Sequence, residues 1–226
     1  MVSYNIKVVL TPLEDIQYES TYEKLSNLIS YAMTKDEQLK LLHEENTYKM
    51  YCFCSLYPYQ DTGVYKLGAI YQFDIRTLDL DFAIKIKTLL TDLKSEFFKV
   101  IMVNLVTNEQ RNITELRTLT PCVITTTKNG YKIDNDLELV KERLLSGAEK
   151  KYKLLFGEKI SHDFIEQIEQ TNRKPIKLPY KNIHFLANKF VIKVKQDELS
   201  QKLAYILFAT GALEKNSLGM GFCTAK

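Results

Sequence analysis

The pattern of apolar and polar positions in the first half of the chain predicts strands separated by helices. Four segments alternate in the manner of half-buried strands: residues 4–10, 48–57, 64–75 and 99–107. Residues 20–33 and 79–93 instead place apolar side chains at helical spacing, and a short helix is expected over 36–42. Residues 112–119 are expected to pair with 99–107 as a hairpin. The predicted order is strand, helix, strand, strand, helix, strand.

The second half of the chain predicts the same order of elements again. Strands are expected over residues 122–127, 164–170 and 184–195, with helices over 135–156 and from Asp197 onward. Asn129 and Gly130 form a strong hairpin signal, because both residues tolerate positive φ. Two βαββαβ units predict an α+β fold of two tandem ferredoxin-like domains. We expect an N-terminal domain over residues 1–119 and a C-terminal domain over residues 120–226.

The composition agrees with a globular protein of the cytoplasm. The chain has 226 residues, of which 45% are hydrophobic and 26% charged, enough for two small cores. No run approaches the roughly 20 apolar residues of a membrane span, and the first residues lack the apolar core of a signal peptide. The four cysteines do not have zinc-site spacing, so we expect them to be small buried side chains in a reducing compartment.

The distribution of charge favours a polyanionic partner, although the formal net charge of +3 is too small to indicate one. Residues 173–195 contain seven Lys or Arg residues and no Asp or Glu. Tyr180, Phe185 and Phe190 interleave with them, which suits phosphate contacts combined with base stacking. The alternative is a solvated surface with core aromatics. The candidate RNA contacts are Arg173, Lys174, Lys177, Lys181 and Lys193. The long helix predicted over residues 135–156 adds further cations: Lys141, Arg143, Lys150, Lys151 and Lys153. Its far end is expected to flank the groove in which the basic segment would hold RNA.

A glycine-rich segment, GALEKNSLGMG at residues 211–221, lies between the last helix and the last strand. Glycine allows positive φ and close approach of another chain, and successive N–H groups can cradle a phosphate. A helix C-cap followed by a turn would explain Gly211 alone, but not the Lys-Asn-Ser run before Gly-Met-Gly. The candidate RNA contacts in this segment are Gly211, Lys215, Asn216, Ser217, Gly219 and Gly221.

This segment resembles the C-terminal glycine-rich loop of the CRISPR-associated endoribonucleases that process precursor CRISPR RNA, members of the RAMP superfamily. The resemblance extends to the tandem ferredoxin-like plan and to an early helix that is followed by a histidine. The chain departs from the family at Leu213, where a further glycine is often found.

The resemblance implies RNA cleavage without a metal or another cofactor. The 2′-hydroxyl beside the scissile phosphate attacks it, which gives a 5′-hydroxyl and a 2′,3′-cyclic phosphate. Such a reaction needs a base, an acid and a cation. By resemblance, His43 is the general base or acid, Tyr31 positions or assists, and Lys49 stabilises charge. Each residue has a structural alternative: a helix-dipole partner for His43, an exposed tyrosine for Tyr31 and a solvated lysine for Lys49.

The expected partner is CRISPR repeat RNA, the precursor of guide RNA. We expect no binding to a membrane. Other effector-complex subunits and a second copy of the chain are further candidate partners. A competing hypothesis is a RAMP-type subunit that holds guide RNA without cutting it. A more distant one is an unrelated ferredoxin-like enzyme with a small phosphorylated ligand in the glycine-rich loop.

Overall fold

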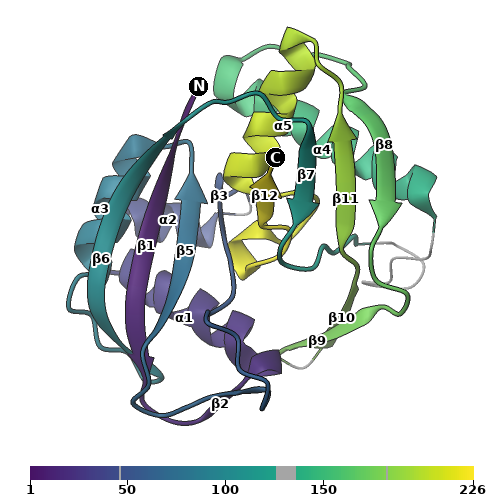
Figure 1. The fold of residues 1–226 in the computed structure, drawn as a ribbon. Helices are drawn as coiled ribbons and strands as arrows, with labels where there is room; N and C mark the ends of the chain where they lie inside the picture. Colours follow the sequence, from purple (N-terminus) through teal and green to yellow (C-terminus); the bar gives the residue numbers. More distant parts are fainter. Residues whose placement is uncertain (46, 126–135, 182) are drawn as a thin grey trace.

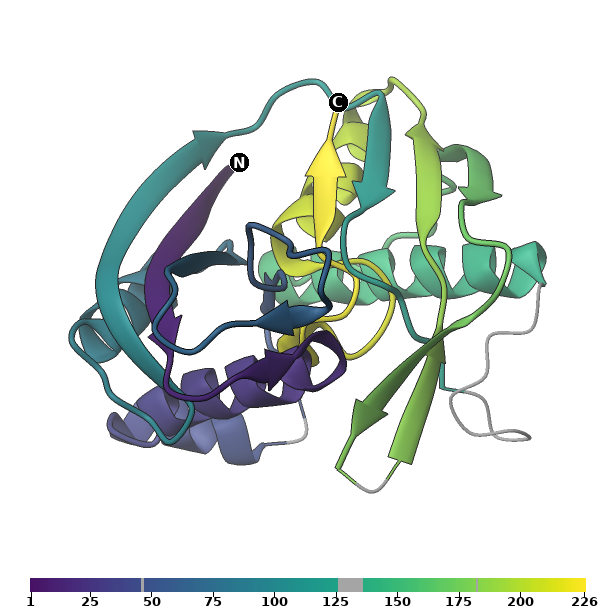
Figure 2. The same ribbon diagram turned by 60° about the horizontal axis from the view of Figure 1, so that its bottom comes forward.

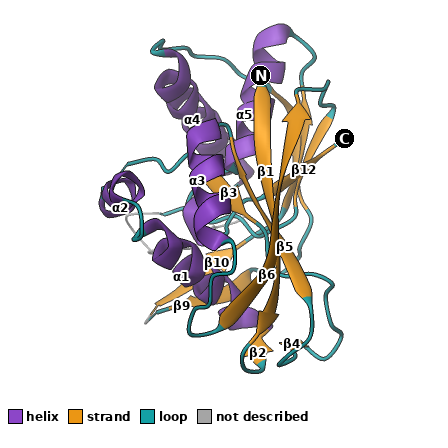
Figure 3. Ribbon diagram, turned by 90° about the vertical axis from the view of Figure 1, so that its left-hand side faces the viewer, coloured by secondary structure: helices purple, strands orange, loops and turns teal. Residues whose placement is uncertain are grey.

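Two four-stranded antiparallel sheets form the centre of the protein (Figure 1). The structure is a computed structural model, and it describes residues 1–45, 47–125, 136–181 and 183–226. The α-helices lie on one side of the two main sheets (Figure 3). Two-stranded sheets, β2–β4 and β9–β10, lie at the margin of the molecule. The protein is therefore a mixed fold in which helices cover one face of each main sheet.

The first sheet has the strand order β3-β5-β1-β6. Alternation in β1 buries Ile6, Val8 and Leu10 against the helices. The strands of this half are β1 (Val2–Pro12), β2 (Ile16–Gln17), β3 (Tyr51–Phe53), β4 (Val64–Tyr65), β5 (Tyr71–Thr77) and β6 (Phe98–Glu109). The helices are η1 (Tyr18–Ser20), α1 (Thr21–Met33), α2 (Glu37–Glu44) and α3 (Leu80–Leu90). Both long helices and the short one were predicted from periodicity, and these predictions are confirmed.

The second sheet has the strand order β12-β7-β11-β8. Its strands are β7 (Glu115–Thr118), β8 (Ile165–Gln170), β11 (Phe190–Val194) and β12 (Cys223–Ala225), and β9 (Ile176–Tyr180) pairs with β10 (Ile183–Ala187) as a separate hairpin. The helices are α4 (Leu137–Phe156), α5 (Glu198–Thr210) and η2 (Asn216–Leu218). In the described ranges no helix is long and apolar enough to cross a membrane.

Four strand predictions are wrong. The segment 64–75 is two strands in different sheets, β4 and β5, and not one. The segment 112–119 does not form a hairpin with 99–107, because β6 pairs with β1 while β7 pairs with β11 and β12. The first strand of the second sheet is accordingly β7, and not the segment 122–127 that was predicted. Cys122 and Val123 form only isolated bridges. The segment 184–195 is two strands, interrupted at Asn188 and Lys189, because Lys189 N turns away to donate to Asn172 Oδ1. The predicted turn at residues 129–130 lies outside the described residues.

Arg76 on β5 joins the two halves of the molecule. Its buried guanidinium donates from Nη1 to the carbonyls of Phe208 on α5, at 2.7 Å, and Cys223 on β12, at 2.9 Å. The same group lies 3.8 Å from the centre of the Phe208 ring and 4.2 Å from that of Phe222. Charge-assisted hydrogen bonds and cation–π contacts strengthen in a desolvated site. The first sheet is thereby fixed to the end of the chain that carries the glycine-rich segment.

Candidate functional site

His43 occupies the last turn of α2. The helix begins at the Asp36 cap, whose carboxylate accepts a hydrogen bond from Leu39 N at 3.0 Å. The imidazole is half-buried, and within the described residues its buried Nδ1 has no hydrogen-bond partner. Burial lowers the pKa of His43, and the positive charges of Lys49 and Lys181 lower it further against the opposing effect of Glu44. The side chain is therefore neutral near pH 7 and able to accept a proton.

Two lysines from different parts of the chain accompany His43. Lys49 Nζ donates to the backbone carbonyl of His43 at 2.7 Å, and partial burial lowers the pKa of Lys49. Lys181 lies at the end of the β9–β10 hairpin, where its backbone N donates to Glu23 Oε2 of α1 at 3.2 Å. Figure 2 shows α2 and this hairpin at the same end of the molecule. A neutral imidazole and two ammonium groups therefore share one region.

The lowered pKa of His43 gives a pH prediction. We expect an NMR titration of the His43 ring to give a pKa below 6.5, the ordinary value for histidine. Removing a neighbouring positive charge with Lys49→Met or Lys181→Met should raise that pKa. If His43 acts as a base, the cleavage rate should rise with pH through its pKa and then level off. A pKa above 6.5 in the unaltered protein would contradict the arrangement described for the imidazole.

Tyr31 lies on α1, a different helix from the one that carries His43. Its side chain is 46% exposed on α1, and Lys35 Nζ is 4.8 Å from the centre of its ring. Tyr31 lines a pocket with Lys24 and with residues 94–97, which precede β6. No hydrogen bond in the described part of the chain links Tyr31 to His43. The structure therefore brings Lys49 to the backbone of His43, a contact that the sequence left open, and shows no hydrogen bond from Tyr31 to either residue in its described part.

The glycine-rich segment has left-handed backbone at five positions: Gly211, Leu213, Lys215, Gly219 and Gly221 have φ of 91°, 58°, 60°, 87° and 71°. Leu213 stands where a further glycine was expected from the resemblance. A left-handed conformation costs a non-glycine residue about 1–2 kcal/mol. The side chain of Leu213 is buried in the core of the second half, which offsets that cost. The loop thus keeps a glycine-like conformation at a leucine.

The glycines of this segment face the interior. A Cβ on Gly221 would lie 1.9 Å from the carbonyl oxygen of Ala212, and one on Gly219 would lie 2.7 Å from the Phe53 and Tyr22 rings. Backbone N–H groups are also used internally, since Gly221 N donates to Pro121 O at 2.9 Å. The expected cradle of N–H groups for phosphate is therefore largely replaced by contacts within the protein. These glycines shape the loop.

Asn216 is likewise a residue of the loop interior. Its Nδ2 donates to Ala212 O at 2.9 Å and to Met220 O at 3.0 Å, and its Oδ1 accepts from Lys151 Nζ. The expectation that this amide donates to RNA is thus corrected, because its hydrogen-bonding groups are already engaged. Gly211 has no room for a side chain, because an added Cβ would lie 2.6 Å from the amide nitrogen of Asn216. Lys215 and Ser217 are half-exposed and remain candidate RNA contacts.

The basic segment divides between the β9–β10 hairpin and the second sheet. Arg173, Lys174, Lys177 and Lys181 are exposed on the hairpin and its approach. Lys193 is exposed on β11, in register with Glu115 and Gln167 on the neighbouring strands. Phe185 and Phe190 are buried, so the expectation that they stack on bases is wrong. For both phenylalanines the structure favours the alternative interpretation, in which they are core residues.

A pocket rich in tyrosines was not anticipated from the sequence. It has a volume of about 710 Å³ and lies between the first sheet and the β9–β10 hairpin. The ring of Tyr18 is 4.1 Å from that of Tyr59 and 4.4 Å from that of Tyr65, and Lys177 and Lys189 also line the pocket. The signal in the sequence was the dense group of tyrosines at positions 57–65. Within the residues that the structure describes, no three His, Cys, Asp or Glu side chains could together hold a metal ion.

Comparison with solved structures defines the class of fold. A structure described as "CRISPR associated protein Cas6" superposes with a TM-score of 0.76 at 21% identity and covers 99% of both chains. A structure described as "An RAMP protein binding different RNA substrates" superposes with a TM-score of 0.77 at 20% identity, and it also covers 99% of both chains. A structure described as "Characterization of a Cas6-related gene from Pyrococcus furiosus" gives 0.74 at 20% identity, and covers 99% of this chain and 98% of that one. At these identities the likeness shows the fold.

Sequence comparison shows the family. The model of the family "CRISPR associated protein Cas6, C-terminal" matches residues 104–225, more than half of the chain. The protein "CRISPR-associated endoribonuclease Cas6 2" of Methanocaldococcus jannaschii is 24% identical over 96% of this chain and 97% of its own length. The chain belongs to the Cas6 family.

Proposed function

We propose that this chain is an endoribonuclease that cuts CRISPR repeat RNA in the maturation of guide RNA. The observation that carries the proposal is the half-buried His43 with Lys49 bonded to its backbone and Lys181 close enough to lower its pKa. Family membership and the name of the Methanocaldococcus jannaschii relative support the same activity. They favour it over the hypothesis of a non-cutting RNA-binding subunit.

The proposed chemistry uses the RNA itself as the nucleophile and requires no metal or other cofactor. Neutral His43 takes the proton of the 2′-hydroxyl, whose oxygen attacks the adjacent phosphorus. Lys49 and Lys181 stabilise the negative charge that develops on the phosphorane oxygens. The bond from phosphorus to the 5′ oxygen then breaks, and solvent protonates the departing oxygen. The products are a 2′,3′-cyclic phosphate and a 5′-hydroxyl.

The remaining candidate residues are proposed to hold RNA. The exposed cations Arg173, Lys174 and Lys177 are suited to the phosphate backbone, as are Lys215 and Lys193. The tyrosine pocket offers aromatic faces beside Lys177 and Lys189, a combination that suits unpaired bases. Tyr31 is assigned to RNA contact because it is exposed and has no hydrogen bond to His43 in the described part of the chain. Ser217 adds a neutral donor near Lys215.

The two halves are proposed to be ferredoxin-like domains. In the first half the order of the elements and the sheet order β3-β5-β1-β6 agree with one βαββαβ unit, and in the second half β12-β7-β11-β8 agrees with another. Since β7 belongs to the second sheet, we place the boundary between the two domains within residues 110–114, and not between residues 119 and 120 as the sequence predicted. The histidine and Lys49 then belong to the first domain, and the β9–β10 hairpin to the second.

The proposal is tested by incubating the protein with repeat RNA in excess EDTA and analysing the ends of the products. We expect cleavage that yields 2′,3′-cyclic phosphate and 5′-hydroxyl termini, because no step of the reaction uses a metal ion. RNA that is bound but stays intact, with or without added divalent metal, would contradict the enzyme and support the RNA-binding subunit. Absence of RNA binding at low salt would contradict both.

A further inference from the structure

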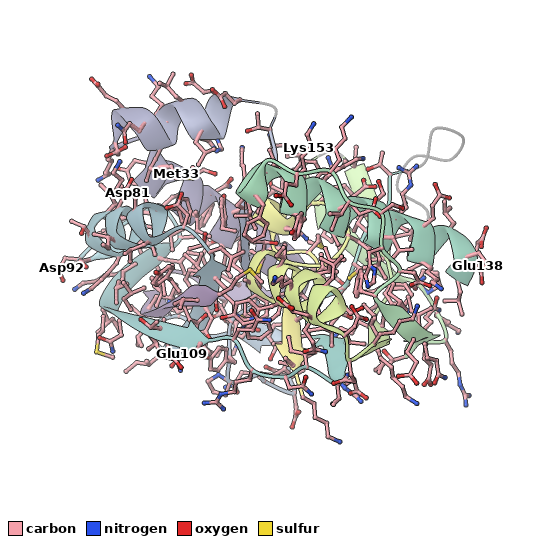
Figure 4. The ribbon with its side chains drawn as sticks, turned by 90° about the horizontal axis from the view of Figure 1, so that it is seen from above. Met33, Asp81, Asp92, Glu109, Glu138 and Lys153 are labelled. Atoms are coloured by element: carbon pink, nitrogen blue, oxygen red, sulfur yellow. The ribbon has the colours of Figure 1, made fainter. Side chains whose placement is uncertain are left out.

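Lys151 of α4 is a buried lysine bound to the glycine-rich loop. Its exposure is 1%, and Nζ donates to Thr210 O at 3.3 Å, to Gly211 O at 2.6 Å and to Asn216 Oδ1 at 2.8 Å. An ammonium group has three N–H donors, and here each has an acceptor. The sequence predicted a surface lysine flanking an RNA groove, and that prediction is wrong. In the view from above, α4 crosses over the C-terminal segments of the chain (Figure 4).

The three acceptors lie at two separate places in the loop. Thr210 is the last residue of α5 and Gly211 is its C-cap, so their carbonyls lack the donors that a continuing helix would supply. Asn216 is the first residue of η2, and its amide donates to Ala212 and Met220. Lys151 and Asn216 together therefore tie the beginning of the loop to its middle and its end.

The loop in turn packs against the segment that carries Lys49. Gly219 lies so close to Phe53 of β3 and Tyr22 of α1 that a Cβ would be 2.7 Å from either ring. The strand β3 begins two residues after Lys49, and Tyr51 N donates to Lys49 O at 2.7 Å. The loop thus packs against the strand that follows Lys49, in addition to the pairing that holds β3 to β5.

Burial of an ammonium group without a counter-charge is unfavourable, and burial lowers the pKa of Lys151 to about 8. Among the described residues no carboxylate forms an ion pair with Lys151 to offset that burial. A methionine would fill the same space without the charge. Packing alone therefore does not account for a lysine at this position, whereas the need to bind three oxygens of one loop does.

We propose that Lys151 is a positioning residue for cleavage, which fixes the glycine-rich loop and, through it, the placement of Lys49 beside His43. This inference rests on the proposed function for its catalytic consequence, and on the geometry alone for its effect on the loop. The residue touches neither the RNA nor the reacting atoms.

The test replaces Lys151 and separates binding from cleavage. We expect Lys151→Met to lower the single-turnover rate of repeat-RNA cleavage by about tenfold or more, because small misplacement of a reacting group is costly. The Kd for repeat RNA should change by less than about threefold. Lys159→Met, at an exposed position just beyond the end of α4, is the control and should cleave at the rate of the unaltered protein. A folded Lys151→Met protein with an unaltered rate would overturn the proposal.

A second variant and a second measurement keep the test decisive. If Lys151→Met does not fold, Asn216→Ala keeps the lysine, removes one of its three acceptors together with the two hydrogen bonds that the amide donates within the loop, and should also lower the rate. Hydrogen exchange of residues 211–222 reports on the loop without any RNA, and both variants should exchange faster there. If the unaltered protein fails to cut repeat RNA, the proposed function is lost while faster exchange still supports the loop contact. Unaltered exchange in both variants would overturn that contact.

Discussion

Replacing His43 with alanine is expected to reduce single-turnover cleavage of repeat RNA by about 10²–10⁴-fold, the usual contribution of a general base. The loss should appear in the rate and not in the Kd for RNA, since His43 is half-buried and the exposed cations carry the electrostatic contacts. A rapid-quench assay with protein in excess over labelled RNA measures both quantities.

His162 provides the control for this substitution. It lies between α4 and β8, and its Nε2 reaches the start of α5, 2.9 Å from Ser200 Oγ and 3.1 Å from Asp197 Oδ1. The variant His162→Ala is expected to cleave within about threefold of the unaltered rate, since it alters a partly exposed contact remote from His43. A His43→Ala protein that cuts as fast as this control would show that His43 is not the base.

Replacing Gly221 with alanine is expected to lower the free energy of unfolding by about 4 kcal/mol or more. The new Cβ would lie 1.9 Å from the backbone oxygen of Ala212, and backbone cannot move aside as a flexible side chain can. The residue also has φ of +71°, which disfavours any side chain. Urea denaturation followed by circular dichroism measures the change.

Gly157 separates these two causes. It has φ of +77°, close to that of Gly221, but a Cβ there would meet nothing within 4 Å. Gly157→Ala should therefore cost only about 1–2 kcal/mol, the penalty of the left-handed backbone alone. Equal losses for the two variants would show that close packing at Gly221 is not what requires glycine in the loop.

Elements that depend on local sequence were predictable. Asp79 and Asp197 each stand before an apolar helical pattern, and each caps its helix by accepting from the backbone N three residues later. Helix capping and periodicity involve neighbours in the chain, so the sequence displays them directly. Strand pairing is not local. Residues 115–118 read as a partner for the preceding strand, but they pair with β11 and β12, from 70 or more residues later.

The sequence named His43 and Lys49 through the family resemblance, without showing whether the two residues meet. His43 and Lys49 are six residues apart, and the structure joins them by a hydrogen bond. The helical periodicity of residues 20–33 predicted that Tyr31 is exposed. Periodicity alone does not show which other residues lie near an exposed side chain. Lys181 and Lys151 reach the site and the loop through tertiary packing, so their contributions could not be predicted from a charge pattern. Lys151 illustrates this best, because a basic helix face suggested solvent where the structure has a buried ammonium group.

The central claim, attack by the RNA's own 2′-hydroxyl, is tested most directly with a single 2′-deoxy substitution at the scissile nucleotide. The substituted and all-ribose repeat RNAs are incubated side by side with the protein in EDTA. We expect the all-ribose RNA to be cut and the substituted RNA to bind equally well but remain intact at that position, because its nucleophile is missing. Cleavage of the 2′-deoxy RNA at the same phosphate would contradict the mechanism.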